Sequence, residues 1–162
     1  YVDVGGGSTE INLISEGELK SSRSYNIGTV RMLSGMVKNE EKEQMHTDLE
    51  VLAKEYAPIH IIGSGGNINK LFRLADKKDK KQLFLPLASL QDIYRTLKDL
   101  PKEQRIKLFK LKPDRADVIV PAAEIFMEVA TRVQANGIIV PTIGLSDGII
   151  DCLYTKNRQW MQ

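Results

Sequence analysis

Near its start the chain carries the segment Asp3-Val4-Gly5-Gly6-Gly7-Ser8-Thr9-Glu10, which lies between two strand-like runs. Three successive glycines let the backbone adopt angles that a side chain would forbid, and they let amide groups approach an anion closely. Ser8 adds a hydroxyl donor, and we expect Asp3, at the end of the first strand, to face the same space. A carboxylate beside a phosphate is a usual arrangement for holding Mg²⁺. The segment therefore predicts a phosphate-binding turn with a divalent cation at Asp3.

The alternative for residues 5–7 is a simple glycine-rich hairpin turn. Two residues suffice for such a turn, so three glycines with an upstream aspartate favour the phosphate interpretation. The segment is not a P-loop, because no Gly-Lys-Ser/Thr sequence follows it.

A second glycine turn occupies the run Ile61-Ile62-Gly63-Ser64-Gly65-Gly66-Asn67. It reads as a buried strand, a turn and the start of a helix, whose unpaired amides and positive dipole end suit a phosphate. It is not a Rossmann fingerprint, whose third glycine would stand at Lys70. When this run is considered alone, a tight strand-to-helix turn without a ligand is the favoured interpretation.

Hydrophobic periodicity predicts the elements around these two turns. The expected order is strands over 1–4, 9–15 and 19–27, helices over 29–37 and 41–56, a strand over 59–62, a helix from Asn67, three more helices, a strand over 138–140 and a closing helix from Ser146. We expect Leu19, Tyr25 and Ile27 to share one face of the third strand. An antiparallel three-strand start followed by alternating strands and helices indicates an α/β domain with a mixed sheet, over residues 1–162.

Three helix boundaries follow from local signals. Ser89 with Asp92 predicts a capping box, and Pro101 fits the first turn of the next helix. The longest helix pattern covers residues 117–135, and we expect Pro121 to lie in or near its first turn because an internal proline would kink it.

Composition excludes several classes of protein. The chain has 162 residues, of which 42% are hydrophobic and 27% charged, so disorder and fibrous folds are excluded. One cysteine and two histidines exclude a disulfide framework, a cysteine zinc site and a histidine metal cage. There is no run of 18 apolar residues and no signal peptide, so we expect a cytoplasmic protein without membrane contact. The chain begins with Tyr1 inside a strand-like run, so we expect a fragment of a longer protein.

Charge is unevenly distributed, although the formal net charge is only +2. Residues 70–115 carry 14 Lys/Arg against 6 Asp/Glu, a net charge of +8, and would attract polyanions. We interpret this segment as a solvated loop and the outer faces of two helices. No aromatic residues interleave with its lysines, so no nucleic-acid partner is expected.

The two glycine turns on this order of elements resemble the actin-like ATPase and phosphatase superfamily, which has a ribonuclease H-like fold. Residues 3–11 are similar almost letter for letter to the exopolyphosphatase and guanosine pentaphosphate phosphatase (Ppx/GppA) family. Further similar segments are Asn26-Ile27-Gly28-Thr29-Val30-Arg31, Gly63-Ser64-Gly65-Gly66-Asn67 and Pro113-Asp114-Arg115-Ala116-Asp117-Val118-Ile119. Ser146-Asp147 stands where that family has Arg-Glu. If that arginine contacts the substrate, its absence here leaves open which polyphosphate or nucleotide is bound.

The resemblance implies an enzyme that releases terminal phosphate from inorganic polyphosphate, from pppGpp, or from both, by Mg²⁺-assisted attack of water. It implies two actin-like domains with the site between them, of which this chain is the second. The general base would then belong to the missing first domain, so no catalytic residue is expected in this chain and the isolated chain should be inactive. A homodimer is one expected state of the full-length protein.

The resemblance also assigns roles to individual residues. Metal ligation is implied for Asp3 and Glu10. Phosphate binding is implied for Gly5, Gly6, Gly7, Ser8, Gly65 and Gly66. Arg31 either holds a phosphate or is a surface arginine, and we interpret Arg115 and Asp117 as a structural ion pair.

Two other functions remain open at this point. One is a sensor domain that binds ppGpp or polyphosphate without hydrolysing it, because binding and catalysis need the same cradle. The other is an actin-like domain that binds ATP, against which Asn67 and Ile68 offer no obvious selectivity for adenine.

Overall fold

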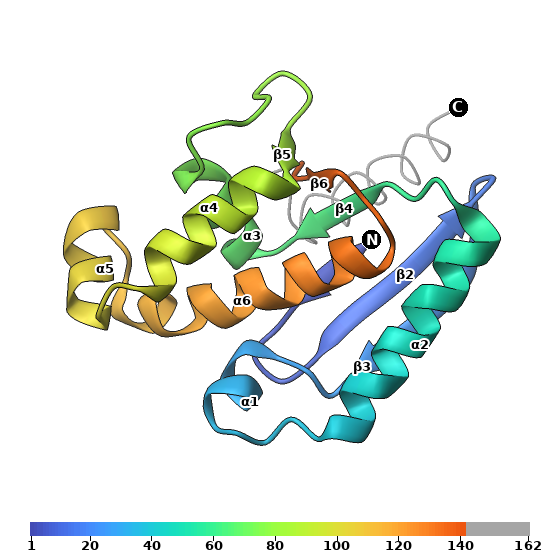
Figure 1. Cartoon of the computed structure of the whole chain (residues 1–162), viewed down its shortest axis with the longest axis horizontal. Coiled ribbons are helices and arrows are strands. Elements are labelled where there is room, and N and C mark those ends of the chain that lie inside the picture. The colour runs from blue at the N-terminus through green and yellow to red at the C-terminus, as the bar shows by residue number, and fades with distance from the viewer. Residues whose placement is uncertain (142–162) are drawn as a thin grey trace, which may run out of the picture.

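The computed structural model of the chain describes residues 1–141 (Figure 1). The strands are β1 (Val2–Val4), β2 (Thr9–Ser15), β3 (Glu18–Tyr25), β4 (Ile61–Ser64), β5 (Phe84–Pro86) and β6 (Gly137–Ile139). The helices are α1 (Thr29–Leu33), α2 (Asn39–Tyr56), α3 (Gly66–Leu74), α4 (Leu87–Lys98), α5 (Lys102–Phe109) and α6 (Pro113–Arg132). The predicted α/β class and the antiparallel three-strand start are confirmed. The closing helix expected from Ser146 lies outside the described residues.

Six strands form one mixed sheet in the order β3-β2-β1-β4-β6-β5. The β1–β2–β3 meander is antiparallel, whereas β1, β4 and β6 run parallel to one another in the centre. β5 closes the far edge as an antiparallel neighbour of β6. The carboxyl ends of β1 and β4 therefore lie side by side, and each leads into one of the two glycine turns.

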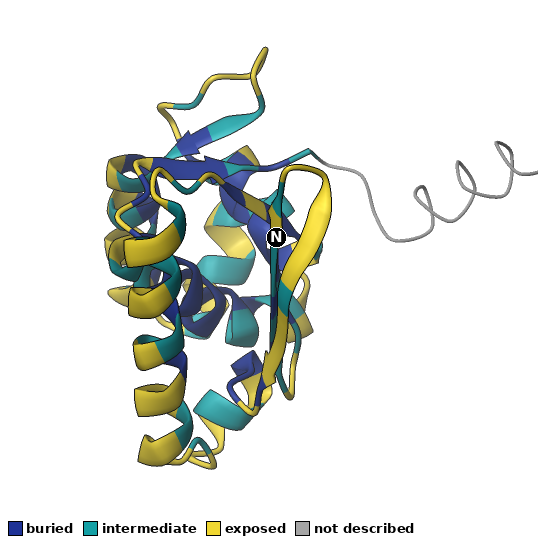
Figure 2. Cartoon of the chain, turned by 90° about the vertical axis from the view of Figure 1, so that its right-hand side faces the viewer, coloured by how far each residue is buried: buried dark blue, intermediate teal, exposed yellow. Residues whose placement is uncertain are grey.

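The helical layer covers one face of this sheet, with α6 between α2 and α4 (Figures 1 and 2). Because successive side chains of a strand point to opposite faces of the sheet, the residues of β1 and β2 divide into a core-facing set and an opposite set. Val2, Val4 and Ile11 are buried in the hydrophobic core, whereas Asp3 and Glu10 occupy the intervening positions and are only half-buried. The carboxylates of the predicted site thus lie on the sheet face opposite the core helices.

A β-bulge corrects the expected face of Leu19. Leu13 pairs with Ser21 but Ile14 pairs with Leu19, so Lys20 is an extra residue on β3. The extra residue reverses the alternation, and Leu19 is 62% exposed whereas Tyr25 is buried. A strict period of two across 19–27 was therefore the wrong prediction.

The structure adds one strand to the prediction and corrects three expectations about helix starts. The short strand β5 was not predicted, and it leads directly into α4, which begins at Leu87 with no side-chain cap, so Ser89 is not a capping residue. The long helix begins at Pro113, whose missing N–H is harmless in a first turn. Pro121 therefore lies inside α6, not in its first turn.

No helix within residues 1–141 is long and apolar enough to cross a membrane.

Candidate functional site

The first glycine loop is built against α1. The Gly5 carbonyl accepts a hydrogen bond from the Thr29 amide at 3.0 Å, and the Gly6 carbonyl accepts one from the Val30 amide at 2.9 Å. Gly5 N–H closes the turn by donating to the Ser8 carbonyl at 2.9 Å. The carbonyl side of the loop is therefore directed at the helix start and satisfied there.

The amide side of the same loop is left open. Among residues 1–141 the amides of Gly6, Gly7 and Ser8 donate to no protein acceptor. Three successive amides without an acceptor, at the end of a strand, form a concavity suited to an anion. This geometry is the one that the sequence predicted for a phosphate cradle.

Gly28 permits the close approach of α1 to this loop. A Cβ placed on Gly28 would lie only 2.5 Å from the carbonyl carbons of both Gly6 and Gly7. No backbone atom can move aside as a side-chain tip does, so a residue larger than glycine would push the loop and α1 apart. Gly28 lies in residues 26–31, one of the segments that resemble the Ppx/GppA family, but the sequence did not indicate this contact.

Asp3 and Glu10 face each other across two strands. They are direct register partners in the antiparallel β1–β2 pair, so both carboxylates lie on the same face of the sheet. Glu10 Oε1 accepts hydrogen bonds from the Ser8 hydroxyl at 2.6 Å and from the Ser24 hydroxyl at 3.1 Å. Glu10 is thereby fixed beside the loop, with its second oxygen unused by these bonds.

The environment of Asp3 disfavours its negative charge. Burial raises the pKa of the Asp3 carboxyl above its usual value, the neighbouring Ser64 hydroxyl lowers it in part, and the charge of Glu10 raises it further. Ser64 Oγ is itself buried and has no partner at hydrogen-bond geometry within the described chain. Two facing carboxylates and an unsatisfied hydroxyl make a local excess of oxygen donors that a cation would relieve.

This donor set fits a divalent cation of the Mg²⁺ type. Mg²⁺ is usually bound by one or two carboxylates, with water and substrate phosphate completing its shell. Within residues 1–141 no cluster of three or more His, Cys, Asp or Glu side chains could hold a metal. Asp3 and Glu10 would therefore supply the protein ligands of the cation, and water and substrate phosphate oxygens would complete its shell.

The second glycine turn lies beside Asp3. Gly65 has φ 103°, a backbone conformation that favours glycine, and a Cβ there would lie 3.2 Å from Asp3 Oδ1. Gly66 begins α3 and leaves room for the guanidinium of Arg115, whose Nη1 would lie 2.6 Å from a Cβ on Gly66. Arg115 Nη1 also donates to Asn67 Oδ1 at 2.8 Å.

Arg115 is the functional candidate that the sequence interpretation missed. The expected ion pair between Arg115 and Asp117 is absent from the described residues, where Asp117 pairs with Lys102 instead. Arg115 turns toward the N-terminus of α3, a position that neither its spacing from Asp117 nor its neighbours in the sequence indicate. Only the packing of α6 against α3 brings it there.

Arg31 lies at the first loop. Its Nε donates to the Gly7 carbonyl at 2.9 Å, so one edge of the guanidinium supports the loop. All nine predicted site residues therefore gather around the carboxyl ends of β1 and β4. Their roles in phosphate and metal binding remain predictions.

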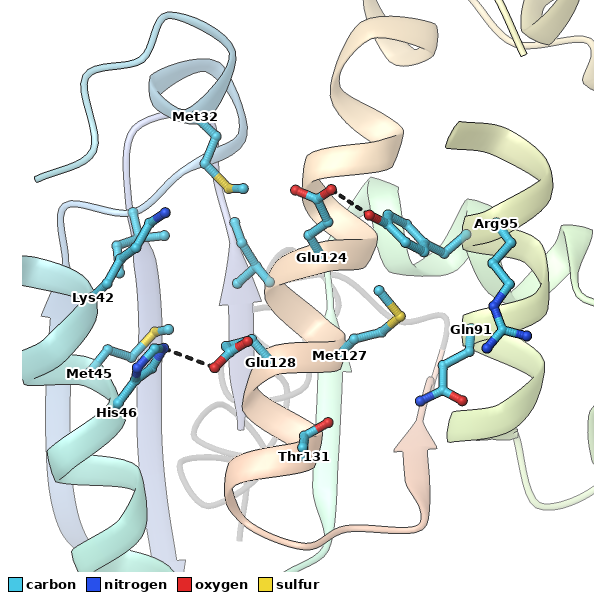
Figure 3. A pocket seen from close by; sticks show the side chains of 13 residues that line it. Met32, Lys42, Met45, His46, Gln91, Arg95, Glu124, Met127, Glu128 and Thr131 are labelled. Carbon is cyan, nitrogen blue, oxygen red and sulfur yellow. Dashed lines mark hydrogen bonds and ion pairs between the residues drawn. The ribbon is translucent and has the colours of Figure 1, made fainter. Parts of the chain in front are cut away.

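A cavity of about 550 Å³ lies elsewhere, over α6 between α2 and α4 (Figure 3). Methionines 32, 45 and 127 contribute to its walls, and two pairs of its polar groups are in contact: His46 with Glu128 at 2.9 Å, and Tyr94 with Glu124 at 2.7 Å. None of the nine predicted site residues lines it.

The fold and the two glycine turns are those of a known family: the chain belongs to the Ppx/GppA phosphatase family, whose model matches residues 1–157. Among curated proteins it is similar to Exopolyphosphatase 2 of Mycobacterium tuberculosis, strains CDC 1551/Oshkosh and H37Rv. The identity is 28% over 171 aligned residues, covering 91% of this chain and 53% of the relative.

Solved structures support the same fold. The Ppx/GppA family member of Aquifex aeolicus matches with a TM-score of 0.72 and 27% identity, over 96% of this chain and 56% of that chain. An exopolyphosphatase from Cytophaga hutchinsonii matches with a TM-score of 0.74 at 22% identity, over 94% and 55%, which supports the fold alone. The actin-like fold is thus confirmed. The chain spans about half the length of the curated relatives it matches.

Proposed function

We propose that this chain forms one wall of the active site of an enzyme that releases terminal phosphate from inorganic polyphosphate, from pppGpp, or from both. The observation that carries the proposal is the set of open amides at Gly6, Gly7 and Ser8 directly beside the facing carboxylates of Asp3 and Glu10. The name of the M. tuberculosis relative, an exopolyphosphatase, supports the reaction class.

In this proposal the first glycine loop binds the terminal phosphoryl group. Its amides donate to the phosphoryl oxygens, and because the loop is held by α1 they need no reorganisation as negative charge develops there. Arg31, already fixed by the Gly7 carbonyl, directs its remaining N–H groups to the same group. A divalent cation on Asp3 and Glu10 would supply charge neutralisation and orientation of water.

The general base is proposed to belong to a first actin-like domain preceding this chain in the full-length protein. At the described site the carboxylates are Asp3 and Glu10, and the proposal assigns both to the cation. Cytoplasmic location and a homodimer of the full-length protein remain expectations.

The test is phosphate release by the full-length protein from long-chain polyphosphate and from pppGpp, with and without Mg²⁺. We expect metal-dependent release that Asp3→Ala reduces by at least about a hundredfold, the scale of losing a group that neutralises transition-state charge. Asp76→Ala is the matched control, because Asp76 is exposed and forms no ion pair within residues 1–141.

Each alternative outcome has a definite meaning. Metal-independent release, or equal loss in both variants, would reject the assignment of the cation to Asp3. Binding of either ligand without release would favour the non-hydrolysing sensor, and binding of ATP at both glycine turns would favour the ATP-binding domain.

A further inference from the structure

A group of five cationic side chains surrounds the turn between α5 and α6 and the first half of α3. We call it the cationic corner; its members are Lys70, Lys107, Lys110, Lys112 and Arg115. Lys70 Nζ donates to the Phe109 carbonyl at 3.1 Å, which ties α3 to the end of α5. Lys107, Lys110 and Lys112 are exposed, and Lys70 and Arg115 are half-buried.

Two other basic residues of α5 have partners on α6 or at the end of α4. Lys102 pairs with Asp117, and Arg105 donates to the carbonyls of Leu97 and Ala116. Within residues 1–141 no member of the cationic corner forms an ion pair. The corner is therefore a concentration of positive charge that the described fold leaves without carboxylate partners.

Two of these cations lie at helix N-termini, where a positive charge is electrostatically unfavourable. Lys112 is the N-cap residue of α6, and Arg115 is in its first turn. The Arg115 guanidinium also lies at the start of α3, whose first turn has no acidic residue. Because helix N-termini carry partial positive charge, cations there are destabilising. Asp114 offsets this effect in the first turn of α6, whereas at the start of α3 only a bound anion would relieve it.

The corner is continuous with the first glycine loop. Asp3 lies against Gly65, and the next residue, Gly66, lies against the Arg115 guanidinium. Lys112 precedes Arg115 by three residues, at the start of the same helix. A chain of phosphates that begins in the loop can therefore pass the cation proposed at Asp3 and the second glycine turn, and reach the corner at Arg115.

We propose that the cationic corner binds the distal phosphates of an extended polyphosphate chain whose terminal phosphate lies in the first glycine loop. This inference rests on the proposed function. It assigns part of the basic segment to substrate, in place of the solvated surface that the sequence favoured. Binding through exposed lysines implies affinity that depends on chain length and decreases with salt.

The densest lysine run, at residues 77–81, supplies a matched control. It follows the other end of α3, and Lys78 is folded back to donate to the Ala75 and Arg73 carbonyls. Lys80 and Lys81 are exposed and form no ion pair within the described chain. The double variant K80Q/K81Q therefore removes the same charge as K110Q/K112Q at a different place.

The experiment compares wild type, K110Q/K112Q and K80Q/K81Q in the full-length protein. Direct binding of long-chain polyphosphate is measured over a range of salt concentrations, and KM is measured for long-chain polyphosphate and for tripolyphosphate. We expect K110Q/K112Q to weaken binding of the long chain by about fivefold at low salt, the scale of two exposed charge contacts. The slope of log affinity against log salt should decrease by about 1.4, taking about 0.7 per contact as for single-stranded polyanions.

For K110Q/K112Q we expect KM to increase more for the long chain than for tripolyphosphate, and K80Q/K81Q to resemble wild type. Equal weakening by the two double variants would overturn the proposal, as would equal changes for both substrates. If wild type hydrolyses neither substrate, the proposed function fails while the binding comparison still decides whether the corner holds polyphosphate.

Discussion

The Asp3 carboxylate lies opposite Glu10 and is partly removed from solvent, so its charge is unfavourable in the folded chain. A group whose pKa is raised on folding stabilises the fold below its unfolded pKa, near 3.8, and loses that contribution as pH rises through the raised value. Ionised Asp3 therefore destabilises the fold at neutral pH. A cation bound at Asp3, as proposed above, would remove this cost.

This argument predicts the effect of Asp3→Asn on stability. The neutral amide removes the cost of burying a charge and the smaller repulsion from Glu10, so Tm at pH 7 should rise by about 1–2 °C, a small effect because Asp3 retains solvent contact. The gain should shrink as the pH is lowered from 7 to 4, since the native carboxyl, whose pKa is raised, takes up a proton over a higher pH range than an ordinary aspartate. Thermal melting at both pH values tests this, with Asp76→Asn as the exposed control; a lower Tm at pH 7 would contradict it.

Single residues also show how far the sequence could predict the site. Asp3, the loop glycines and Glu10 are close in sequence, so the strand–turn–strand pattern alone brings them together. Arg115 was assigned to the wrong partner because residues two apart on one helix do not face each other, and Asp117 pairs with Lys102 of α5 instead. Its real contact, with Gly66 and Asn67, depends on the packing of two helices that a linear pattern does not contain.

At the scale of elements, α1 and the first glycine loop form one unit. Thr9, which is fully buried, donates from Oγ1 to the Ile27 carbonyl at 2.6 Å and so ties β2 to the segment entering α1. The Gly28 backbone then lies directly on the loop, so that amides at the start of α1 donate hydrogen bonds to the loop carbonyls. The open amides of the cradle thus depend on the docking of α1.

We therefore predict that Gly28→Ala damages both stability and phosphate binding. The added Cβ would meet backbone carbons of Gly6 and Gly7 at 2.5 Å, and relieving that overlap should cost about 1–3 kcal/mol of unfolding free energy. Chemical denaturation measures the stability change, and binding of inorganic phosphate measures the cradle.

Gly7→Ala is the control for Gly28→Ala in the denaturation experiment, because a Cβ on Gly7 meets nothing within 4 Å. Its effect on stability should be small, whatever it does to binding. If the two variants unfold at the same denaturant concentration, the docking of α1 on the loop does not control the cradle.

The elements that the sequence predicted poorly are those that depend on neighbours. The three-residue strand β5 is too short to show a period, and it exists because β6 lies beside it. The bulge at Lys20 reverses the face of Leu19, although the residues around it alternate regularly. Pro121 lies within α6, where it leaves the Asp117 carbonyl without its usual helical N–H donor.

At the scale of the whole molecule, the site occupies the carboxyl ends of the parallel strands β1 and β4. Open α/β sheets bind ligands at such edges, where the loops leaving adjacent strands converge. Here both loops are glycine turns, so backbone rather than side chains forms most of the surface offered to the ligand. That surface is one-sided, since the core helices cover one face of the sheet (Figure 2), whereas Asp3 and Glu10 lie on the opposite face.

This one-sidedness predicts that residues 1–162 alone bind phosphate without releasing it from a substrate. Glu10 is held by Ser8 and Ser24 and faces Asp3, so neither carboxylate is placed as an independent base once both hold a cation. Phosphate release should therefore be undetectable for this chain with Mg²⁺ and long-chain polyphosphate, and present for the full-length protein. Binding of polyphosphate to the chain, lost in Gly6→Trp, would show that the cradle is intact in the inactive piece. Release by residues 1–162 alone would place the base within this chain and remove the need for a second domain in the chemical step.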